Sequence, residues 1–211
     1  MTRVKICGIT RPEDAEHAAS LGAWALGFNL WPGSKRVADP AVVAGIARAL
    51  RRRVELVGIF VNPTLDEVVH VTEAIGFTHV QLHGDEGPAF CTAVAERTGA
   101  RVIKALGIAS GADIRGAERY HTDFHLLDAS AGAAYGGTGR TWDWDLLAQR
   151  RSSVPLILSG GLTPDNVAEA IAAVHPWAVD VASGVESAPG IKDPAKVEAF
   201  IAAAQGSAVP S

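Results

Sequence analysis

Residues 155–184, PLILSGGLTPDNVAEAIAAVHPWAVDVASG, contain one complete strand–helix–strand unit. A short apolar run, Pro155–Ser159, is followed by two glycines and then by a segment with helical apolar spacing, Pro164–Val174. A second apolar run, Val179–Ala182, follows the helical segment. Two strands that are joined by a helix lie parallel in a sheet. The stretch therefore predicts a βαβ unit.

The same unit recurs along the whole chain. Eight strand candidates start about 25 residues apart, and they are Val4–Cys7, Trp24–Leu30, Val54–Val61, His79–His83, Val102–Leu106, Phe124–Asp128, Pro155–Ser159 and Val179–Ala182. Eight such units are the number that closes a (β/α)₈ TIM barrel, and 211 residues lie near the lower size limit of that α/β fold. The alternative is an open doubly wound sheet, whose dinucleotide-binding form needs a GxGxxG pattern that this chain lacks. We expect one barrel domain over residues 1–205 and a frayed tail over 206–211.

Helix-start signals support this periodicity. The helical segments Pro12–Leu21, Pro40–Leu50, Thr64–Ile75 and Pro164–Val174 begin at or next to a proline. A further start is expected at Asp193-Pro194.

Composition excludes several classes of protein. The formal net charge of -4 argues against a nucleic-acid surface, and the apolar runs are too short for a membrane span. The N-terminus carries Lys5 where an export signal would be apolar, and two cysteines without metal-ligand spacing suggest a reduced, cytoplasmic setting. What is unusual is the glycine content, 22 of 211 residues.

Active sites of TIM barrels lie at the carboxyl ends of the strands. Period-two alternation suggests an inward-facing polar set from five strands. Its members are Lys5, Cys7, His79, Gln81, His83, Lys104, Asp128 and Asp180. For Lys5, Gln81 and Lys104 we favour the alternative that they are paired polar groups of the barrel interior without a catalytic role.

Two of these residues are candidates for acid–base chemistry. Cys7 ends the first strand and precedes Gly8, so a thiolate there could serve as a nucleophile or base, although lone cysteines are often small buried hydrophobes. For Cys91, which lies in a predicted helix, we prefer the interpretation of a small buried hydrophobic residue. Asp128 ends an apolar strand, a poor place for a carboxylate unless it is paired or used as an acid. No metal site is expected, because His79 and His83 are spaced for a helix and stand on a strand.

Glycines in the loops after strands 6 to 8 indicate an anion site. Exposed backbone N–H groups can hold phosphate without Lys or Arg, and barrels commonly bind phosphate at the loops after strands 7 and 8. The alternative is that these glycines only form tight turns. The candidate residues are Gly137, Gly139, Gly160, Gly161, Ser183 and Gly184. Arg36 ends the loop after strand 2, where its planar guanidinium suits a carboxylate or is merely solvated.

Taken together, the motifs resemble the phosphoribosylanthranilate isomerase family of tryptophan biosynthesis, in order from Val4 to about Ile201. The matching stretches are VKICGIT (4–10), GFNLWPGSKR (27–36), VQLHGDE (80–86), LSGGLTPDNV (158–167) and VDVASGVESAPGIKD (179–193). The loop WPGSKR departs from the usual sequence, which is closer to YPKSPR.

The resemblance implies a cofactor-independent Amadori rearrangement of N-(5-phosphoribosyl)anthranilate to 1-(2-carboxyphenylamino)-1-deoxyribulose 5-phosphate. It implies Cys7 as general base, Asp128 as general acid and Arg36 as the contact to the anthranilate carboxylate. It places His83 and Asp180 near the substrate, and the loop glycines and Ser183 at its phosphate. The expected partner is this small molecule, with no nucleic acid or membrane, in a monomer or homodimer.

Two rival functions remain open at this point. Another phosphosugar barrel is possible, such as a metal-dependent epimerase or an aldolase that uses Lys104 as a Schiff-base lysine. A barrel that binds a phosphometabolite without catalysis is the alternative from another class, and the presence of Cys7 and Asp128 argues against it.

Overall fold

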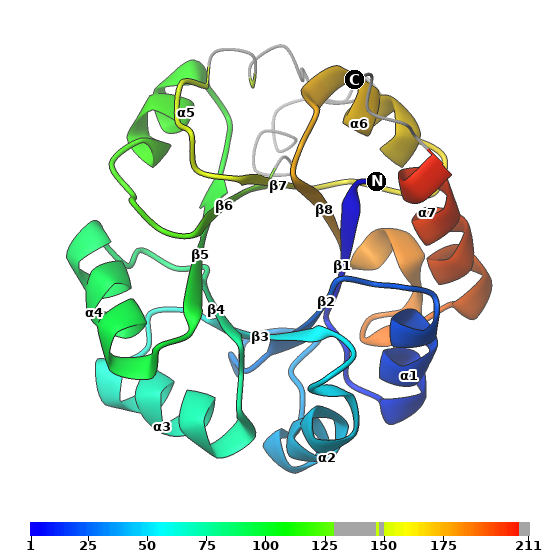
Figure 1. The fold of residues 1–211 in the computed structure, drawn as a ribbon, viewed down its shortest axis with the longest axis horizontal. Coiled ribbons are helices and arrows are strands. Elements are labelled where there is room, and N and C mark those ends of the chain that lie inside the picture. The colour runs from blue at the N-terminus through cyan, green and yellow to red at the C-terminus, as the bar shows by residue number, and fades with distance from the viewer. Residues whose placement is uncertain (129–146, 148–149, 207–211) are drawn as a thin grey trace.

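A computed structural model of the chain describes residues 1–128, 147 and 150–206. Eight parallel strands form a closed barrel in chain order, which confirms the predicted fold (Figure 1). The strands are β1 Arg3–Cys7, β2 Ala25–Asn29, β3 Glu55–Phe60, β4 His79–Leu82, β5 Arg101–Gly107, β6 Phe124–Asp128, β7 Leu156–Ser159 and β8 Ala178–Val181. Each lies within two residues of its predicted bounds at either end.

Helices surround the barrel (Figure 1). They are α1 Pro12–Ser20, α2 Pro40–Leu50, α3 Leu65–Ile75, α4 Pro88–Thr98, α5 Gly111–Ala117, α6 Val167–Val174 and α7 Pro194–Gly206. The proline starts of α1, α2 and α7 are confirmed. Thr64 and Glu67 form a capping box at α3, which satisfies two backbone N–H groups at that helix start.

The predicted start of α6 at Pro164 was wrong. The helix begins at Val167, because Asn166 first closes a turn with Thr163. The Thr163 N–H donates to Asn166 Oδ1 at 2.8 Å, and the Asn166 N–H donates back to the Thr163 carbonyl at 3.3 Å. The Thr163 carbonyl also accepts from the Val167 N–H at 3.1 Å, so this turn leads into the helix and occupies the three residues before it.

A short segment after β8 was not predicted. The 3₁₀ turn Ser183–Val185 leads into an antiparallel hairpin of β9, Glu186–Ala188, and β10, Ile191–Lys192. Gly190 lies in this hairpin with φ of +79°, a conformation that favours glycine. The hairpin places two charged residues, Glu186 and Lys192, near the mouth of the barrel.

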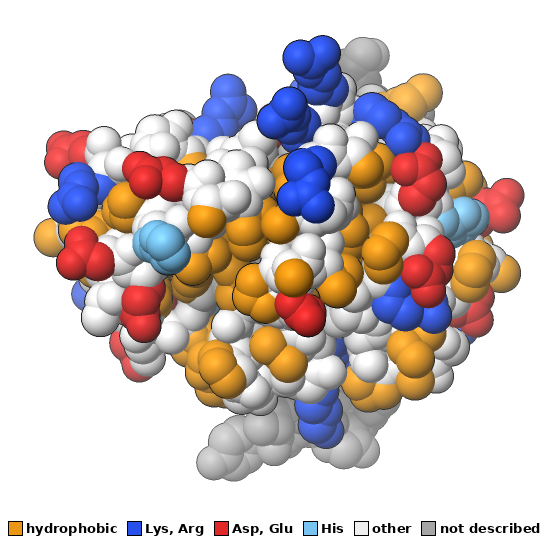
Figure 2. Space-filling model, turned by 90° about the horizontal axis from the view of Figure 1, so that it is seen from below, with side chains coloured by type: hydrophobic (Ala, Val, Ile, Leu, Met, Phe, Trp, Pro, Cys, Tyr) orange, Lys and Arg blue, Asp and Glu red, His pale blue; other side chains and the backbone are white. Residues whose placement is uncertain are grey.

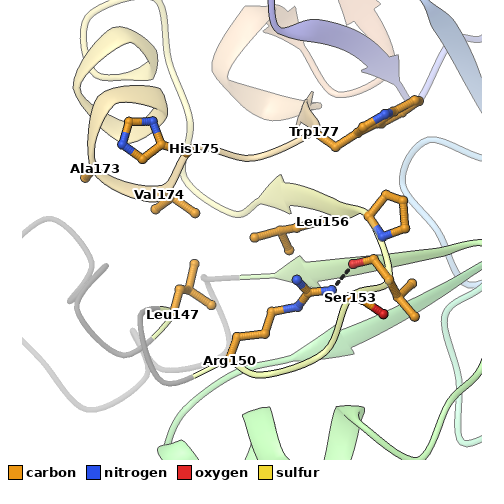
Figure 3. A pocket seen from close by; sticks show the side chains of 10 residues that line it. Leu147, Arg150, Ser153, Leu156, Ala173, Val174, His175 and Trp177 are labelled. Atoms are coloured by element: carbon orange, nitrogen blue, oxygen red, sulfur yellow. Dashed lines mark hydrogen bonds between the residues drawn. The ribbon is translucent and has the colours of Figure 1, made fainter. Parts of the chain in front are cut away.

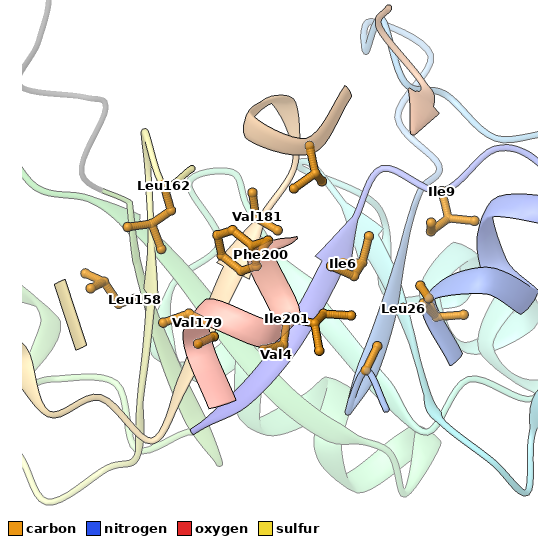
Figure 4. Close-up of a cluster of buried hydrophobic side chains, with 14 of the residues drawn as sticks. Val4, Ile6, Ile9, Leu26, Leu158, Leu162, Val179, Val181, Phe200 and Ile201 are labelled. Atoms are coloured by element: carbon orange, nitrogen blue, oxygen red, sulfur yellow. The ribbon is translucent and has the colours of Figure 1, made fainter. Parts of the chain in front are cut away.

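Apolar packing forms two layers. Between barrel and helices, Phe200 and Ile201 of α7 pack against the outward side chains of β1 and β8 (Figure 4). Inside the barrel a second cluster contains Val57, Ile59, Ile103, Ala105, Leu126 and Ile157. The rings of Trp24, His79, Phe124 and Trp177 contact one another beside this cluster, at the amino ends of the strands. These rings pack at the end of the barrel opposite the carboxyl ends, where active sites of TIM barrels lie.

The prediction that Lys104 faces into the barrel was wrong. Its neighbours Ile103 and Ala105 belong to the interior cluster, so alternation turns Lys104 outward. Its Nζ donates to Glu86 Oε2 at 2.7 Å and to the Gly84 carbonyl at 2.6 Å, both in the loop after β4. Alternation showed which residues of β5 share a face, whereas closure of the barrel decided which face is inside.

The outer surface is mixed in character. Figure 2 shows the flank around α2, where acidic and basic side chains are interspersed with apolar ones. Among the described residues, the helices are all too short or too polar to cross a membrane.

Candidate active site

The carboxyl ends of the strands bring most of the predicted residues to one end of the barrel. Cys7 is the last residue of β1 and Asp128 is the last residue of β6. His83 directly follows β4, and Asp180 lies one residue before the end of β8. Gly137 and Gly139, which were also predicted, lie outside the described residues. Because β7 and β8 separate β6 from β1, the thiol and the carboxylate stand on different sides of the barrel mouth.

A buried ion pair lies beneath Cys7. The Lys5 ammonium donates to Asp180 Oδ1 at 2.7 Å, and the Ser159 hydroxyl donates to Asp180 Oδ2 at 3.0 Å. Burial opposes the charge on Lys5, but the Asp180 carboxylate outweighs that effect and raises the pKa of Lys5 above its ordinary value. Lys5 therefore remains charged within the barrel.

The Cys7 thiol lies next to this lysine. A Cβ placed on Gly27 would lie 3.1 Å from both Cys7 Sγ and Lys5 Nζ, so the glycine makes room for the two groups. Burial raises the pKa of the Cys7 thiol, and the Lys5 ammonium offsets part of that increase. The thiol is thus a weak acid at rest, beside a cation that stabilises its thiolate.

His83 stands near Asp128 at the mouth. Loss of surrounding water lowers the pKa of the His83 imidazole, and the charge of Asp128 partly opposes the change. Gln81, inside the barrel on the same strand, lies 3.2 Å from His83 Nδ1 through its amide nitrogen. A neutral His83 at this position can donate or accept a hydrogen bond from a ligand.

His79 and His83, at the two ends of β4, lie apart from each other. His79 lies among the aromatic rings at the amino end of the strand, whereas His83 follows its carboxyl end. Within the described parts of the chain, no three His, Cys, Asp or Glu side chains are grouped so as to hold a metal ion.

Arg36 does not stand in open solvent. Its Nε and Nη2 donate to the two carboxylate oxygens of Glu186, each at 2.8 Å. Glu186 also accepts from Lys192 Nζ at 2.9 Å. Sequence reasoning had not selected Glu186 or Lys192, although both lie in the SGVESAPGIKD motif. Acidic and basic residues in a loop are usually solvated. Glu186 and Lys192 differ from such residues in being buried, which the sequence does not reveal.

The glycine loops after β7 and β8 touch each other. Gly160 and Gly161 have φ of +96° and +67°, which positions the chain in a sharp turn. A Cβ on Gly184 would overlap the carbonyl oxygen of Leu162, so this glycine allows the two loops to pack together. A Cβ placed on Gly161 would have no atom of the described residues within 4 Å. The backbone there is accessible to a ligand.

A separate cavity of about 530 Å³ opens at the opposite end of the barrel. It lies at the amino ends of β7 and β8, and Leu156, His175 and Trp177 line it (Figure 3). Arg150 crosses this cavity and donates to the Val154 carbonyl (Figure 3). The cavity is distant from the strand ends that carry the thiol and the carboxylates, so the site described above does not depend on it.

Fold and site together define a (β/α)₈-barrel protein with a thiol, an imidazole and two carboxylates at or near the carboxyl ends of its strands. The model of the N-(5'-phosphoribosyl)anthranilate (PRA) isomerase family matches residues 4–203. The chain belongs to this isomerase family.

Individual relatives agree with this assignment. The chain is 49% identical over 201 residues to N-(5'-phosphoribosyl)anthranilate isomerase of Geobacter metallireducens, covering 95% of this chain and 98% of the relative. It is similar to a solved phosphoribosyl anthranilate isomerase in complex with reduced 1-(o-carboxyphenylamino)-1-deoxyribulose 5-phosphate, with a TM-score of 0.84, 40% identity, and coverage of 98% and 100% of the two chains. It is also similar to monomers generated from the dimeric isomerase of Thermotoga maritima, with a TM-score of 0.85, 40% identity and the same coverage.

Proposed function

We propose that this enzyme converts N-(5'-phosphoribosyl)anthranilate to 1-(2-carboxyphenylamino)-1-deoxyribulose 5-phosphate by general acid–base catalysis. The observation that carries the proposal is the placement of Cys7 and Asp128 at the carboxyl ends of β1 and β6, in a chain of this family. The rearrangement moves protons and opens one ring, so it needs no external oxidant or reductant.

Asp128 supplies the first proton. Protonation of the furanose ring oxygen by its carboxyl group breaks the C1–O bond, while the anilino nitrogen lone pair forms the C1=N iminium. His83, which lies near Asp128, is placed to hydrogen-bond the opening sugar.

Cys7 removes the second proton. The iminium acidifies the hydrogen on C2, and the thiolate takes it to leave an enolamine. Loss of the O2 proton and protonation of C1 then give the ketone, so substrate and product are isomers. Lys5 stabilises the thiolate electrostatically because its ammonium lies beside the thiol.

The remaining predicted residues hold the substrate. Asp180 faces the sugar from β8, with Lys5 and Ser159 fixing its carboxylate. Backbone N–H groups of Gly160, Gly161, Ser183 and Gly184 bind the phosphate, in the two loops that pack together. The same role is proposed for Gly137 and Gly139. Arg36 binds the anthranilate carboxylate through its guanidinium.

We propose further that the enzyme acts in the cytoplasm as one barrel domain, as a monomer or homodimer. The two cysteines Cys7 and Cys91 form no disulfide with each other, which suits a reduced compartment. The dimeric relative supports testing for a homodimer. The charge balance gives no support to a nucleic-acid partner.

The test is a fluorescence assay of the purified chain with phosphoribosylanthranilate generated in situ. Turnover of this substrate supports the proposal, and a protein that binds it without turnover favours the catalytically inactive alternative. The aldolase alternative is disfavoured because Lys104 lies outside the strand wall and pairs with Glu86. Borohydride trapping with a ketose phosphate tests it, and a covalent adduct at Lys104 would support the aldolase.

A further inference from the structure

Glu186 is a buried carboxylate that the reaction itself does not use. Its side chain is 5% exposed, yet it lies in β9, just beyond the barrel mouth. It accepts hydrogen bonds from the Arg36 guanidinium, from Lys192 Nζ and, at 3.2 Å, from the Gly190 N–H. A carboxylate with this many donors is held in one orientation.

The charges around Glu186 are not balanced. Burial disfavours its charge, but Arg36 and Lys192 outweigh burial and lower the pKa of the carboxyl group, so Glu186 is ionised. Two cationic side chains therefore bind this one carboxylate, and the Lys196 ammonium donates to the backbone carbonyl of the same residue. Lys192 is 2% exposed, whereas the Arg36 side chain is 28% exposed. The surplus positive charge thus faces outward at Arg36.

The conformation of Arg36 is constrained from several sides. Two of the five N–H donors of a guanidinium are committed to Glu186, so its plane is fixed. A Cβ on Gly8 would lie 2.6 Å from Arg36 Cδ, so the arginine stem runs directly over the residue that follows Cys7. The Arg36 N–H donates to Ser34 Oγ at 3.0 Å, which anchors its backbone.

We propose that Glu186 is a positioning residue that holds Arg36 with its exposed N–H groups toward the anthranilate carboxylate. The inference rests on the proposed function and adds a specificity role to it. The carboxylate pocket is then built from two loops, the one after β2 and the one after β8, whose partners are 150 residues apart. In the WPGSKR loop, support for Arg36 comes from the segment after β8, and only β1 lies between β8 and β2 in the barrel.

A pair of substrates isolates this role. Phosphoribosylanthranilate carries the carboxylate, and phosphoribosylaniline is the same molecule without it. Glu186→Gln keeps the shape of the side chain but removes its charge, so Arg36 loses its fixed plane. We expect kcat/KM for the anthranilate substrate to fall about 10-fold or more, mainly through KM. For the aniline substrate we expect a change of less than about 3-fold.

Two further variants complete the experiment. Glu186→Asp keeps the charge at shorter reach and is expected to retain more of the anthranilate preference than Gln does. Glu16→Gln is the matched control, because Glu16 also binds an arginine through both oxygens, at 2.8 and 2.9 Å from Arg53, in an exposed pair. It is expected to leave both substrates unaffected.

Several outcomes would overturn the inference. Equal losses on both substrates in Glu186→Gln would mean that the residue only supports the fold, and turnover of the aniline substrate shows that the variant is folded. Unchanged kinetics would remove Glu186 from the site. A wild-type protein inactive on phosphoribosylanthranilate would instead refute the proposed function, while an active wild type with an unaltered substrate preference in the variant refutes only this inference.

Discussion

The Lys5 ammonium and the Asp180 carboxylate lie 2.7 Å apart inside the barrel, directly beneath the thiol of Cys7. The two residues are 175 positions apart in the chain and become neighbours because β8 closes against β1. The pair places one full positive charge beside the thiol and a compensating negative charge behind it. It therefore sets the electrostatic environment in which a thiolate must form.

The pH dependence of catalysis tests this arrangement. In the proposed mechanism the base is the thiolate, and burial raises the pKa of Cys7, so ionisation of Cys7 is expected to give kcat/KM a limb that rises with pH. In Lys5→Met the thiolate loses the cation beside it. The pKa of Cys7 then rises further, and the ascending limb moves to higher pH. The pH profile of kcat/KM measures this shift.

A direct measurement of the thiol supplies the control for that prediction. The rate of Cys7 alkylation by iodoacetamide, in a Cys91→Ala background, should show the same shift toward higher pH in Lys5→Met. Lys104→Met, which removes a lysine outside the strand wall, should leave the alkylation profile in place. A Lys5→Met profile that coincides with the wild type would contradict the role given to Lys5.

Removal of either acid–base group should abolish most of the turnover. We expect Cys7→Ser and Asp128→Asn each to lower kcat by at least ~10², the scale of a lost general acid or base. Binding of a reduced product analogue, measured by calorimetry, should change little because both variants keep the shape of the side chain. Near-wild-type kcat in either variant would remove that residue from its proposed role.

Arg36→Met should act mainly on binding. The proposed carboxylate contact would be made in both the ground state and the transition state, so its loss is expected to raise KM more than it lowers kcat. Loss of a pair of charge-assisted hydrogen bonds is expected to increase KM by about 10- to 100-fold. Steady-state kinetics measure it, and an unchanged KM would count against a carboxylate contact at Arg36.

Lys104→Met should affect stability and leave chemistry intact. The substitution leaves the buried carboxylate of Glu86 without its ammonium partner. Breaking a buried ion pair in this way lowers the free energy of unfolding by about 3–5 kcal/mol. The exposed pair of Arg53 and Glu16 is the control, since Arg53→Met should lower the free energy of unfolding far less than Lys104→Met does. Denaturant unfolding measures both changes, and kcat/KM at a permissive temperature should stay within about 3-fold of wild type. A large loss of turnover in folded Lys104→Met would reopen a catalytic role for this lysine.

Much of the fold could be predicted because its signals are local. Apolar runs of strand length, helical spacing and proline starts repeat every 25 residues or so, and eight repeats close a barrel. The start of α6 was misplaced because residues 164–166 form a turn, closed by bonds between Thr163 and Asn166, that comes before the first helical residue. The β9–β10 hairpin escaped prediction because its strands are only three and two residues long.

The sequence by itself determined the order of strands and helices, and thereby which residues end up at the carboxyl ends, Cys7 and Asp128 among them. Only the tertiary structure decided the partners. Period-two alternation sorts a strand into two faces without saying which face is interior, so the outward position of Lys104 and its bond to Glu86 emerged from barrel closure. The pairing of Arg36 with Glu186 likewise needs two distant loops to meet at one rim. Local patterns encode local conformation, whereas an ion pair depends on where the closed chain brings two charges within reach.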